Sequence, residues 1–203
     1  MKLMFSPFSP YVRKCLVSAH ELGLDGRIEL LASAANPINR DRNIIVHNPL
    51  GKVPTFFTDD GEALFDSRVI CEYLNDLAKG ALFPASGNAR WRALTLQSLG
   101  DGILDAAILA RYEVNLRPEA LRWDDWSRGQ RDKIHTSIAH LNAHPAMLSN
   151  DVTIGNITVG CALWYLDLRF ADFGWRETYP EVAKWYAGYS QRASMKMSWS
   201  LPA

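Results

Sequence analysis

Strand-forming patterns are confined to the first 65 residues of this chain, and almost every later segment has the spacing of helices. A change of pattern at one point is typical of two domains with different architectures. We predict an α/β domain over 1–78, a linker rich in Gly, Pro and Ser over 79–89, and an all-helical domain over 90–203. The length of 203 residues allows each domain a core of its own.

The α/β part has a definite order of elements. The patterns predict strands over 2–5, 27–31, 55–58 and 63–65, and helices over 10–22 and 67–78. The first two strands are separated by a helix, so they should be parallel with a right-handed crossover. The last two are joined by Asp59-Asp60-Gly61, a strong turn signal, and should form an antiparallel hairpin. A longer polar segment lies between these pairs.

The second domain is expected to contain helices only. The patterns place them over 90–115, 124–143, 153–170 and 179–192. The third has a readable start, with Thr153 as N-cap and Asn156 where a capping box prefers Glu or Gln. Its interior from Ile157 to Trp164 is apolar nearly all round, which predicts the central buried helix of this domain.

Charge and cysteine content exclude several classes of protein. Basic and acidic residues balance at 22 each without a strongly charged half, which disfavours a nucleic-acid or anionic-membrane partner. The three cysteines, Cys15, Cys71 and Cys161, are odd in number, far apart in sequence and free of any CxxC, so neither a disulfide scaffold nor a zinc ribbon is indicated. We find no secretion signal or membrane-length apolar stretch and expect a soluble, cytoplasmic protein.

No metal site is expected either. His140 and His144 have the i, i+4 spacing of helical metal ligands, but no acidic residue stands beside them at helical spacing. Pro145 ends the helix immediately after them.

Ser9-Pro10 is the first of three clusters with chemical potential. Proline has no N–H and suits the first position of a helix, which makes Pro10 that position and Ser9 the N-cap. Ser9 then lies just past the carboxyl end of the first strand, at the positive end of a helix dipole. A thiolate there would be stabilised by the dipole and by a hydrogen bond from the hydroxyl. The alternative is that Ser9 only caps its own helix.

The other two clusters come later in the same domain. Pro54 must stand first in its strand, and a cis Val53–Pro54 bond would present the Val53 backbone to an extended, peptide-like ligand. The alternative there is a turn followed by an edge strand. Asp66-Ser67 opens a helix, so free N–H groups and the Ser67 hydroxyl would bind a carboxylate while Asp66 accepts from an ammonium. Simple N-capping is the alternative at that cluster.

The order of these clusters on this frame closely resembles the glutathione S-transferase family, and the bacterial serine-type members fit best. The resemblance covers essentially the whole chain. It implies a thioredoxin-like N-terminal domain that binds glutathione and an all-helical C-terminal domain that completes the pocket for a small electrophile. It also implies that Ser9 hydrogen-bonds the glutathione sulfur, and that the protein is a homodimer with a role in detoxification.

The remaining roles are carried over residue by residue. The resemblance implies that Val53, before a cis Pro54, anchors the cysteinyl unit of glutathione. Asp66 and Ser67 would hold the γ-glutamyl carboxylate and amine, and Lys52 would contact the glycyl carboxylate. Many members have Glu-Ser where this chain has Asp66-Ser67, which is a shorter acid in the same role.

Three further residues have polar or reactive side chains. Asp101 and Asp105 share the spacing of one helix face, and the simplest expectation for both is solvated surface. The resemblance offers another role, because in relatives an acid from this helix of the other subunit can reach the glutathione amine, which makes Asp101 a candidate cross-subunit contact. Cys15, about one and a half turns past Ser9, is expected to be buried and inert.

The leading interpretation is therefore a glutathione transferase that ionises the glutathione thiol for attack on an electrophile. The alternative is a non-catalytic glutathione-binding or regulatory protein on the same fold, since fold does not fix function. A thiol–disulfide oxidoreductase of the glutaredoxin kind is disfavoured, because serine and not cysteine stands at position 9.

Overall fold

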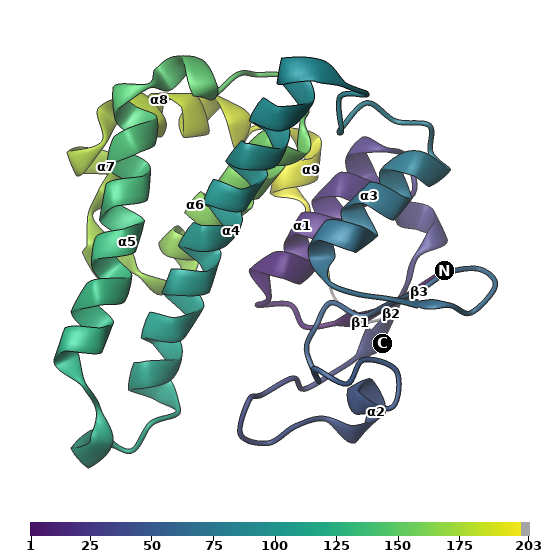
Figure 1. Cartoon of the computed structure of the whole chain (residues 1–203), viewed down its shortest axis with the longest axis horizontal. Helices are drawn as coiled ribbons and strands as arrows, with labels where there is room; N and C mark the ends of the chain where they lie inside the picture. Colours follow the sequence, from purple (N-terminus) through teal and green to yellow (C-terminus); the bar gives the residue numbers. More distant parts are fainter. Residues whose placement is uncertain (200–203) are drawn as a thin grey trace. The chain divides into compact units, whose positions relative to one another are not determined.

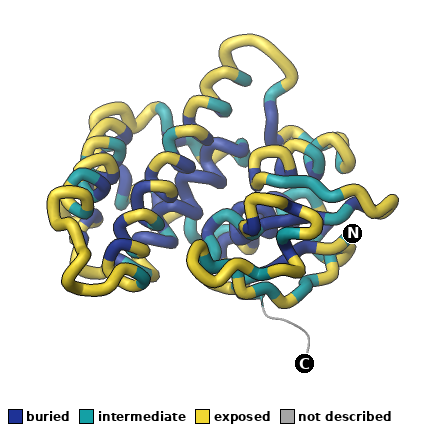
Figure 2. The backbone as a smooth tube through the Cα atoms, turned by 60° about the horizontal axis from the view of Figure 1, so that its bottom comes forward, coloured by how far each residue is buried: buried dark blue, intermediate teal, exposed yellow. Residues whose placement is uncertain are grey.

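The computed structural model describes residues 1–199 and divides into two compact units, shown in Figure 1. Unit 1 comprises Met1–Ala85 together with the segment that begins at Ala193, and unit 2 comprises Ser86–Arg192. Buried positions follow the inner sides of the helices and the sheet, and exposed positions follow loops and outer helix faces (Figure 2).

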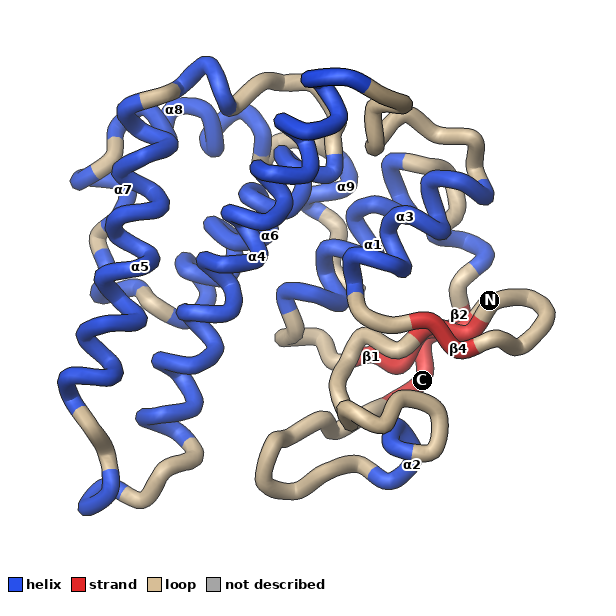
Figure 3. The backbone as a smooth tube through the Cα atoms, viewed as in Figure 1, coloured by secondary structure: helices blue, strands red, loops and turns tan. Residues whose placement is uncertain are grey.

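Unit 1 is built on a four-stranded sheet within the described residues, in the order β2-β1-β3-β4. Figure 3 shows the strands in red and the helices of the same unit in blue. The strands are β1 (Lys2–Phe5), β2 (Glu29–Ala32), β3 (Phe56–Phe57) and β4 (Ala63–Leu64). β1 pairs parallel with β2 and antiparallel with β3, and β3 pairs antiparallel with β4. The predicted parallel pair and the predicted hairpin are both confirmed.

The helices of unit 1 are α1 (Pro10–Glu21), α2 (Arg42–Ile45), α3 (Ser67–Leu77) and α9 (Ala193–Lys196). α1 and α3 cover one face of the sheet, and the short helix α2 lies on the other (Figure 1). α1 packs against both α3 and α9. The core between α1, α3 and the sheet includes the buried side chains Leu3, Val12, Leu16, Phe56, Ile70 and Leu74. α2 was not predicted, because four residues are too few to show a helical period.

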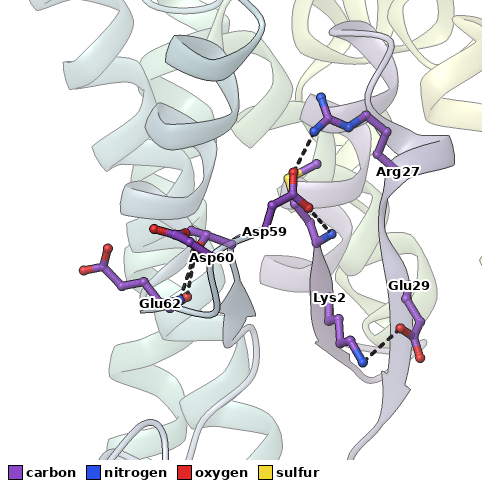
Figure 4. A network of polar contacts seen from close by, with 8 residues as sticks. Lys2, Arg27, Glu29, Asp59, Asp60 and Glu62 are labelled. Carbon is purple, nitrogen blue, oxygen red and sulfur yellow. Dashed lines mark hydrogen bonds and ion pairs between the residues drawn. The ribbon is translucent and has the colours of Figure 1, made fainter.

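An ion-pair network fixes the end of the sheet where β1 begins (Figure 4). The Asp59 carboxylate, in the hairpin turn, accepts from the N-terminal ammonium and from Arg27, each at 2.7 Å. Lys2 and Glu29 form a second pair at 3.3 Å across β1 and β2. The hydrogen bond from the N-terminal ammonium is the main cause that lowers the pKa of Asp59, and Arg27 adds to the effect. This network holds the hairpin turn, the start of β1 and the residues before β2 together.

Unit 2 consists of helices joined by short turns. Its helices are α4 (Gly87–Asn115), α5 (Asp124–Ala143), α6 (Ile154–Arg169), α7 (Trp175–Thr178) and α8 (Pro180–Tyr189). Single 3₁₀ turns occur at Asp25–Arg27 in unit 1 and at Glu119–Leu121, Pro145–Met147 and Ala171–Phe173 in unit 2. α4 is long and apolar enough to cross a membrane by length and composition alone. More than half of its most apolar window is buried inside the protein.

α6 is the central helix of unit 2, as its composition predicts. Thr153 is its N-cap and accepts from the Asn156 N–H at 3.4 Å. The Asn156 amide donates to the Asp151 carbonyl at 2.9 Å, so it braces the preceding loop and does not complete a capping box. Every residue from Ile154 to Leu163 is buried.

α6 packs directly on α4. Gly155 lies against Ala93 and Leu96 of α4 so closely that a side chain at this position has no space. The absence of a Cβ therefore sets the distance between the two central helices.

Candidate functional site

The three predicted clusters meet at one edge of the sheet of unit 1. Leu3 pairs with Phe56, and Phe56 pairs with Leu64. Continuing the first register sets Pro54 beside Phe5, and the Met4 N–H donates to the Thr55 carbonyl at 2.8 Å. β4 ends at Leu64 opposite Phe56, so the chain leaves it towards Asp66 at the same edge. This edge is the carboxyl end of β1, so the loop that leads to Ser9 starts from it. The ion-pair network around Asp59 lies at the opposite end.

Ser9 is the N-cap of α1, as predicted. Its Oγ accepts from the Val12 N–H at 3.3 Å, and Pro10 is the first helical residue. The backbone N–H of Ser9 donates to the Ser6 carbonyl at 3.1 Å, which fixes the loop before the helix. The cap bond uses a lone pair of the hydroxyl and leaves its proton for donation to an anion. Capping and a hydrogen bond to a sulfur are therefore compatible, and half-burial leaves the hydroxyl within reach of a ligand.

Val53–Pro54 is a cis peptide bond, as predicted. Within residues 1–199, neither the N–H nor the C=O of Val53 makes a hydrogen bond to another backbone group. Pro54 is buried and Val53 is half-buried. The Val53 backbone is thus able to pair with an extended peptide-like molecule in the manner of an added strand.

A buried amide and a buried hydroxyl brace this cis segment, and no sequence pattern predicts this role. Asn48 donates to the Thr55 hydroxyl at 2.9 Å and to the Lys52 carbonyl at 3.2 Å. Thr55 in turn donates to the same Lys52 carbonyl at 3.0 Å. Both side chains are buried, so these bonds hold the backbone on each side of Val53. The Lys52 side chain itself is exposed next to Val53.

Asp66 and Ser67 open α3 at the same edge. Asp66 is the N-cap, and its Oδ1 accepts from the Arg68 N–H at 2.8 Å. The Arg68 guanidinium lies 3.8 Å from Oδ2, and the carboxylate remains 57% exposed. Ser67 is the first helical residue and is 2% exposed. Capping by Asp66 is confirmed, and the binding roles of both residues stay predictions.

The N-termini of two helices therefore face the same edge. α1 and α3 have 12 and 11 residues, long enough for each to present a helix dipole and free N–H groups. This edge is suited to an elongated anion with a peptide-like middle.

Asp101 belongs to α4 in unit 2 and is 1% exposed, so the expectation of solvated surface is wrong for it. Asp105, one turn later, is exposed as expected. When a long core helix packs on several neighbours, i, i+4 spacing alone does not show which of its polar residues are buried and which are exposed. The cross-subunit role of Asp101 stays a prediction.

The two spaced histidines lie next to each other at the end of α5. The rings of His140 and His144 lie 4.5 Å apart, and His144 Nδ1 lies 2.8 Å from the His140 carbonyl oxygen. No group of three potential metal-binding side chains occurs in the part of the chain that the structure describes.

Arg13, one turn past Ser9, binds the segment 193–199, and no local sequence pattern predicts this contact. Its guanidinium donates to the Met195 carbonyl at 2.5 Å and to the Met197 carbonyl at 3.2 Å. Ser194 forms a further hydrogen bond with Glu21 at the other end of α1. The segment 193–199 is thereby fixed along α1 within unit 1.

Comparisons with known proteins agree with this geometry. Residues 8–77 match the family model of the glutathione S-transferase N-terminal domain, and residues 124–188 match that of the C-terminal domain. The chain is also 33% identical over 188 residues to the uncharacterized GST-like protein YibF of Escherichia coli K12, covering 91% of each. The chain belongs to the glutathione S-transferase family. Its architecture is that of the family, a thioredoxin-like unit followed by a helical one.

Among solved structures, a family member from Pseudomonas fluorescens Pf-5 is 46% identical, with a TM-score of 0.94 over 100% of this chain and 99% of that one. That protein was crystallised with bound glutathione, and also with bound S-(propanoic acid)-glutathione. A more distant relative is elongation factor 1-gamma of Danio rerio, 26% identical over 157 residues. The match covers 73% of this chain and 34% of that relative.

Proposed function

We propose that this protein is a cytoplasmic glutathione transferase, which binds glutathione and directs its thiolate at an electrophilic substrate. The observation that carries the proposal is the meeting of the N-termini of α1 and α3 with the Val53 backbone at one edge of unit 1. The glutathione-bound structure of the 46% identical relative supports it.

Binding would follow the shape of the tripeptide. The γ-glutamyl carboxylate would accept from the first N–H groups of α3 and from the Ser67 hydroxyl, and its ammonium would lie at the exposed Asp66 carboxylate. The cysteinyl unit would pair with the N–H and C=O of Val53. Lys52 would neutralise the glycyl carboxylate. Each of these groups matches the charge or the hydrogen-bonding capacity of the part of glutathione it receives.

Activation would depend on Ser9. A thiol with an unperturbed pKa of about 8.5 is only a few per cent ionised at neutral pH. The Ser9 hydroxyl would donate a hydrogen bond to the sulfur, and the positive end of α1 would add a favourable field. Both effects favour the thiolate over the thiol and so lower the pKa of the bound sulfur. The thiol proton passes to solvent water, and the thiolate forms a carbon–sulfur bond to the electrophile while the leaving group departs with the electron pair of the bond that breaks.

The second substrate would be a small electrophile bound with the help of unit 2, in keeping with a role in detoxification. We also propose that the active form is a homodimer, in which unit 1 of one subunit meets α4 of the other. The large exposed surface of Trp91 on α4, at 63%, supports an interface there. Asp101 would then act across that interface. Light scattering should give twice the 22.8 kDa of one chain, and a monomer at micromolar concentration would contradict the interface.

A non-catalytic glutathione-binding or regulatory protein is the second candidate. It is favoured by the match to elongation factor 1-gamma, a relative named for a role other than transfer. This candidate predicts glutathione binding without conjugation of an electrophile.

Calorimetry with glutathione and turnover of an activated aryl halide together test the proposal. Ser67→Ala should weaken glutathione binding by about 1–3 kcal/mol, the scale of a hydrogen bond to a charged group. Ser9→Ala should leave affinity nearly unchanged and lower turnover about tenfold to a thousandfold. The two variants are controls for each other, because one removes an anchor and the other removes the activating hydroxyl. Absence of glutathione binding by the wild-type protein would refute both candidates.

A further inference from the structure

Cys15 and Cys71 are distant in sequence and touch in the structure. Their sulfur atoms lie 3.9 Å apart, and the residues are 1% and 0% exposed. Cys15 is on α1 and Cys71 is on α3, two helices that pack directly against each other in unit 1. The spacing of cysteines along the chain gave no sign of this pair, because the contact between the two helices creates it.

The pair lies directly behind the candidate site. The Cys15 sulfur is 3.9 Å from the Ser67 carbonyl oxygen, in the first turn of α3. Cys71 follows Ser67 by about one helical turn, and Cys15 follows the Ser9 cap by about one and a half turns. The two thiols therefore lie between α1 and α3, within about one and a half turns of the helix starts at the candidate site.

We propose that Cys15 and Cys71 form a reversible disulfide when the protein meets hydrogen peroxide, and that this bridge disturbs the first turns of α1 and α3. The modification itself is independent of glutathione chemistry. Its consequence for glutathione binding rests on the proposed function.

The reaction needs two thiols and one peroxide. One thiolate attacks a peroxide oxygen, the O–O bond breaks, and the cysteine becomes a sulfenic acid while the departing hydroxide takes up a proton as water. The second thiolate attacks the sulfenic sulfur, forms the S–S bond and displaces hydroxide, which is protonated to a second water. Two electrons pass from the thiol pair to the peroxide, and the two thiol protons end in the two waters.

Burial selects the oxidant. Both thiols are enclosed in the core, so an oxidant must enter through local opening of the helices. Hydrogen peroxide is close to water in size and can enter in this way, whereas a bulky disulfide such as oxidised glutathione needs a much larger opening.

The bridge would change the geometry of the packed helices. A disulfide bond is about 2.05 Å long, so the sulfurs must approach by nearly 2 Å from their present contact. In a densely packed core, a displacement of this size also moves the neighbouring side chains. Rotation of the two side chains takes up part of this change, and the rest shifts α1 and α3 against each other, and with them the cap at Ser9 and the first turn at Ser67.

The test starts with the reduced wild-type protein, treated with hydrogen peroxide and then alkylated after unfolding. We expect intact mass to show the loss of two hydrogen atoms, peptide mapping to find Cys15 linked to Cys71, and dithiothreitol to reverse both. Cys15→Ala and Cys71→Ala should each abolish the link. Cys161→Ala is the matched control, since Cys161 is also buried but belongs to α6 in unit 2, and it should retain the link.

Hydrogen exchange measures the effect on the helix starts without using activity. The amides that hydrogen-bond to the two caps, Val12 and Arg13 at Ser9 and Arg68 and Ile70 at Asp66, should exchange about tenfold faster in the oxidised protein, and glutathione affinity should fall by about tenfold. Three fully alkylated thiols after peroxide would overturn the bridge. A bridge with unchanged exchange would overturn its coupling to the helix starts. Failure of the reduced protein to bind glutathione would contradict the proposed function alone, because mapping and exchange still decide this inference.

Discussion

Replacing Gly155 by alanine should destabilise unit 2, because α6 has no room there for a side chain. The added Cβ would lie 2.7 Å from the Ala93 carbonyl oxygen and 2.8 Å from the Leu96 Cβ. Both atoms belong to or adjoin the backbone of α4, so neither can turn aside as the end of a long side chain would. Ordinary contacts begin near 3.4 Å, so α6 must move away from α4 by about 0.7 Å.

The size of the loss follows from two opposing effects. Overpacking of this kind costs about 1–3 kcal/mol. Alanine gains up to about 1 kcal/mol over glycine inside a helix, but Gly155 is the second residue of α6, where the backbone N–H has no partner within the helix and the gain is smaller. We expect a net loss of about 1–2 kcal/mol, or a fall in Tm of roughly 2–8 °C for a chain of this size.

Urea unfolding followed by tryptophan fluorescence is the appropriate assay, since every tryptophan except Trp199 belongs to unit 2. Gly102→Ala on α4 is the matched control, because a Cβ there meets nothing within 4 Å. It should stabilise the protein by about 0.5–1 kcal/mol. A Gly155→Ala variant as stable as the wild type, or a Gly102→Ala variant that is equally destabilised, would contradict a steric limit at Gly155.

Three further outcomes are expected. Asp59→Asn should be less stable than the wild type at neutral pH, because the N-terminal ammonium and Arg27 lower the pKa of Asp59. In unfolding titrations, the difference in free energy of unfolding between the two proteins should vanish as the pH falls below about 4 and through the lowered pKa. Glu113→Gln should behave in the same way, because the Trp123 backbone N–H, at 2.9 Å, is the main cause that lowers the pKa of Glu113; an equal gap at pH 2 and pH 7 would contradict this. In the complex with glutathione, Ser9→Ala should shift the thiolate absorbance titration to higher pH, and an unshifted curve would remove Ser9 from the mechanism.

Local rules account for the parts of the fold and site that the sequence predicted. Ser9 and Pro10 form a cap because proline has no N–H to satisfy, and Asp59-Asp60-Gly61 forms a hairpin turn because glycine tolerates the conformation required. The start of α6 at Thr153 follows from the same kind of rule. Each of these features is decided by a few neighbouring residues, so a pattern in the sequence is enough to find it.

The features that the sequence did not predict depend on contacts between distant segments. Cys15 meets Cys71 only because α1 packs on α3, and Arg13 reaches the Met195 carbonyl only because the chain returns to unit 1 after 182 residues. Burial of Asp101 likewise depends on what packs around α4 and not on the spacing within it. No periodicity within a single helix contains this information.

The return of the chain to unit 1 at Ala193 affects how the protein is made on the ribosome. All the strands of unit 1 emerge early, but the segment that Arg13 holds along α1 is translated only after the whole of unit 2. A nascent chain can therefore build the sheet and begin α1 long before the partner of Arg13 exists. A gene fragment that stops at Ala85 encodes an incomplete unit 1, and a protease cut between the units leaves unit 1 in two pieces held together by noncovalent contacts alone.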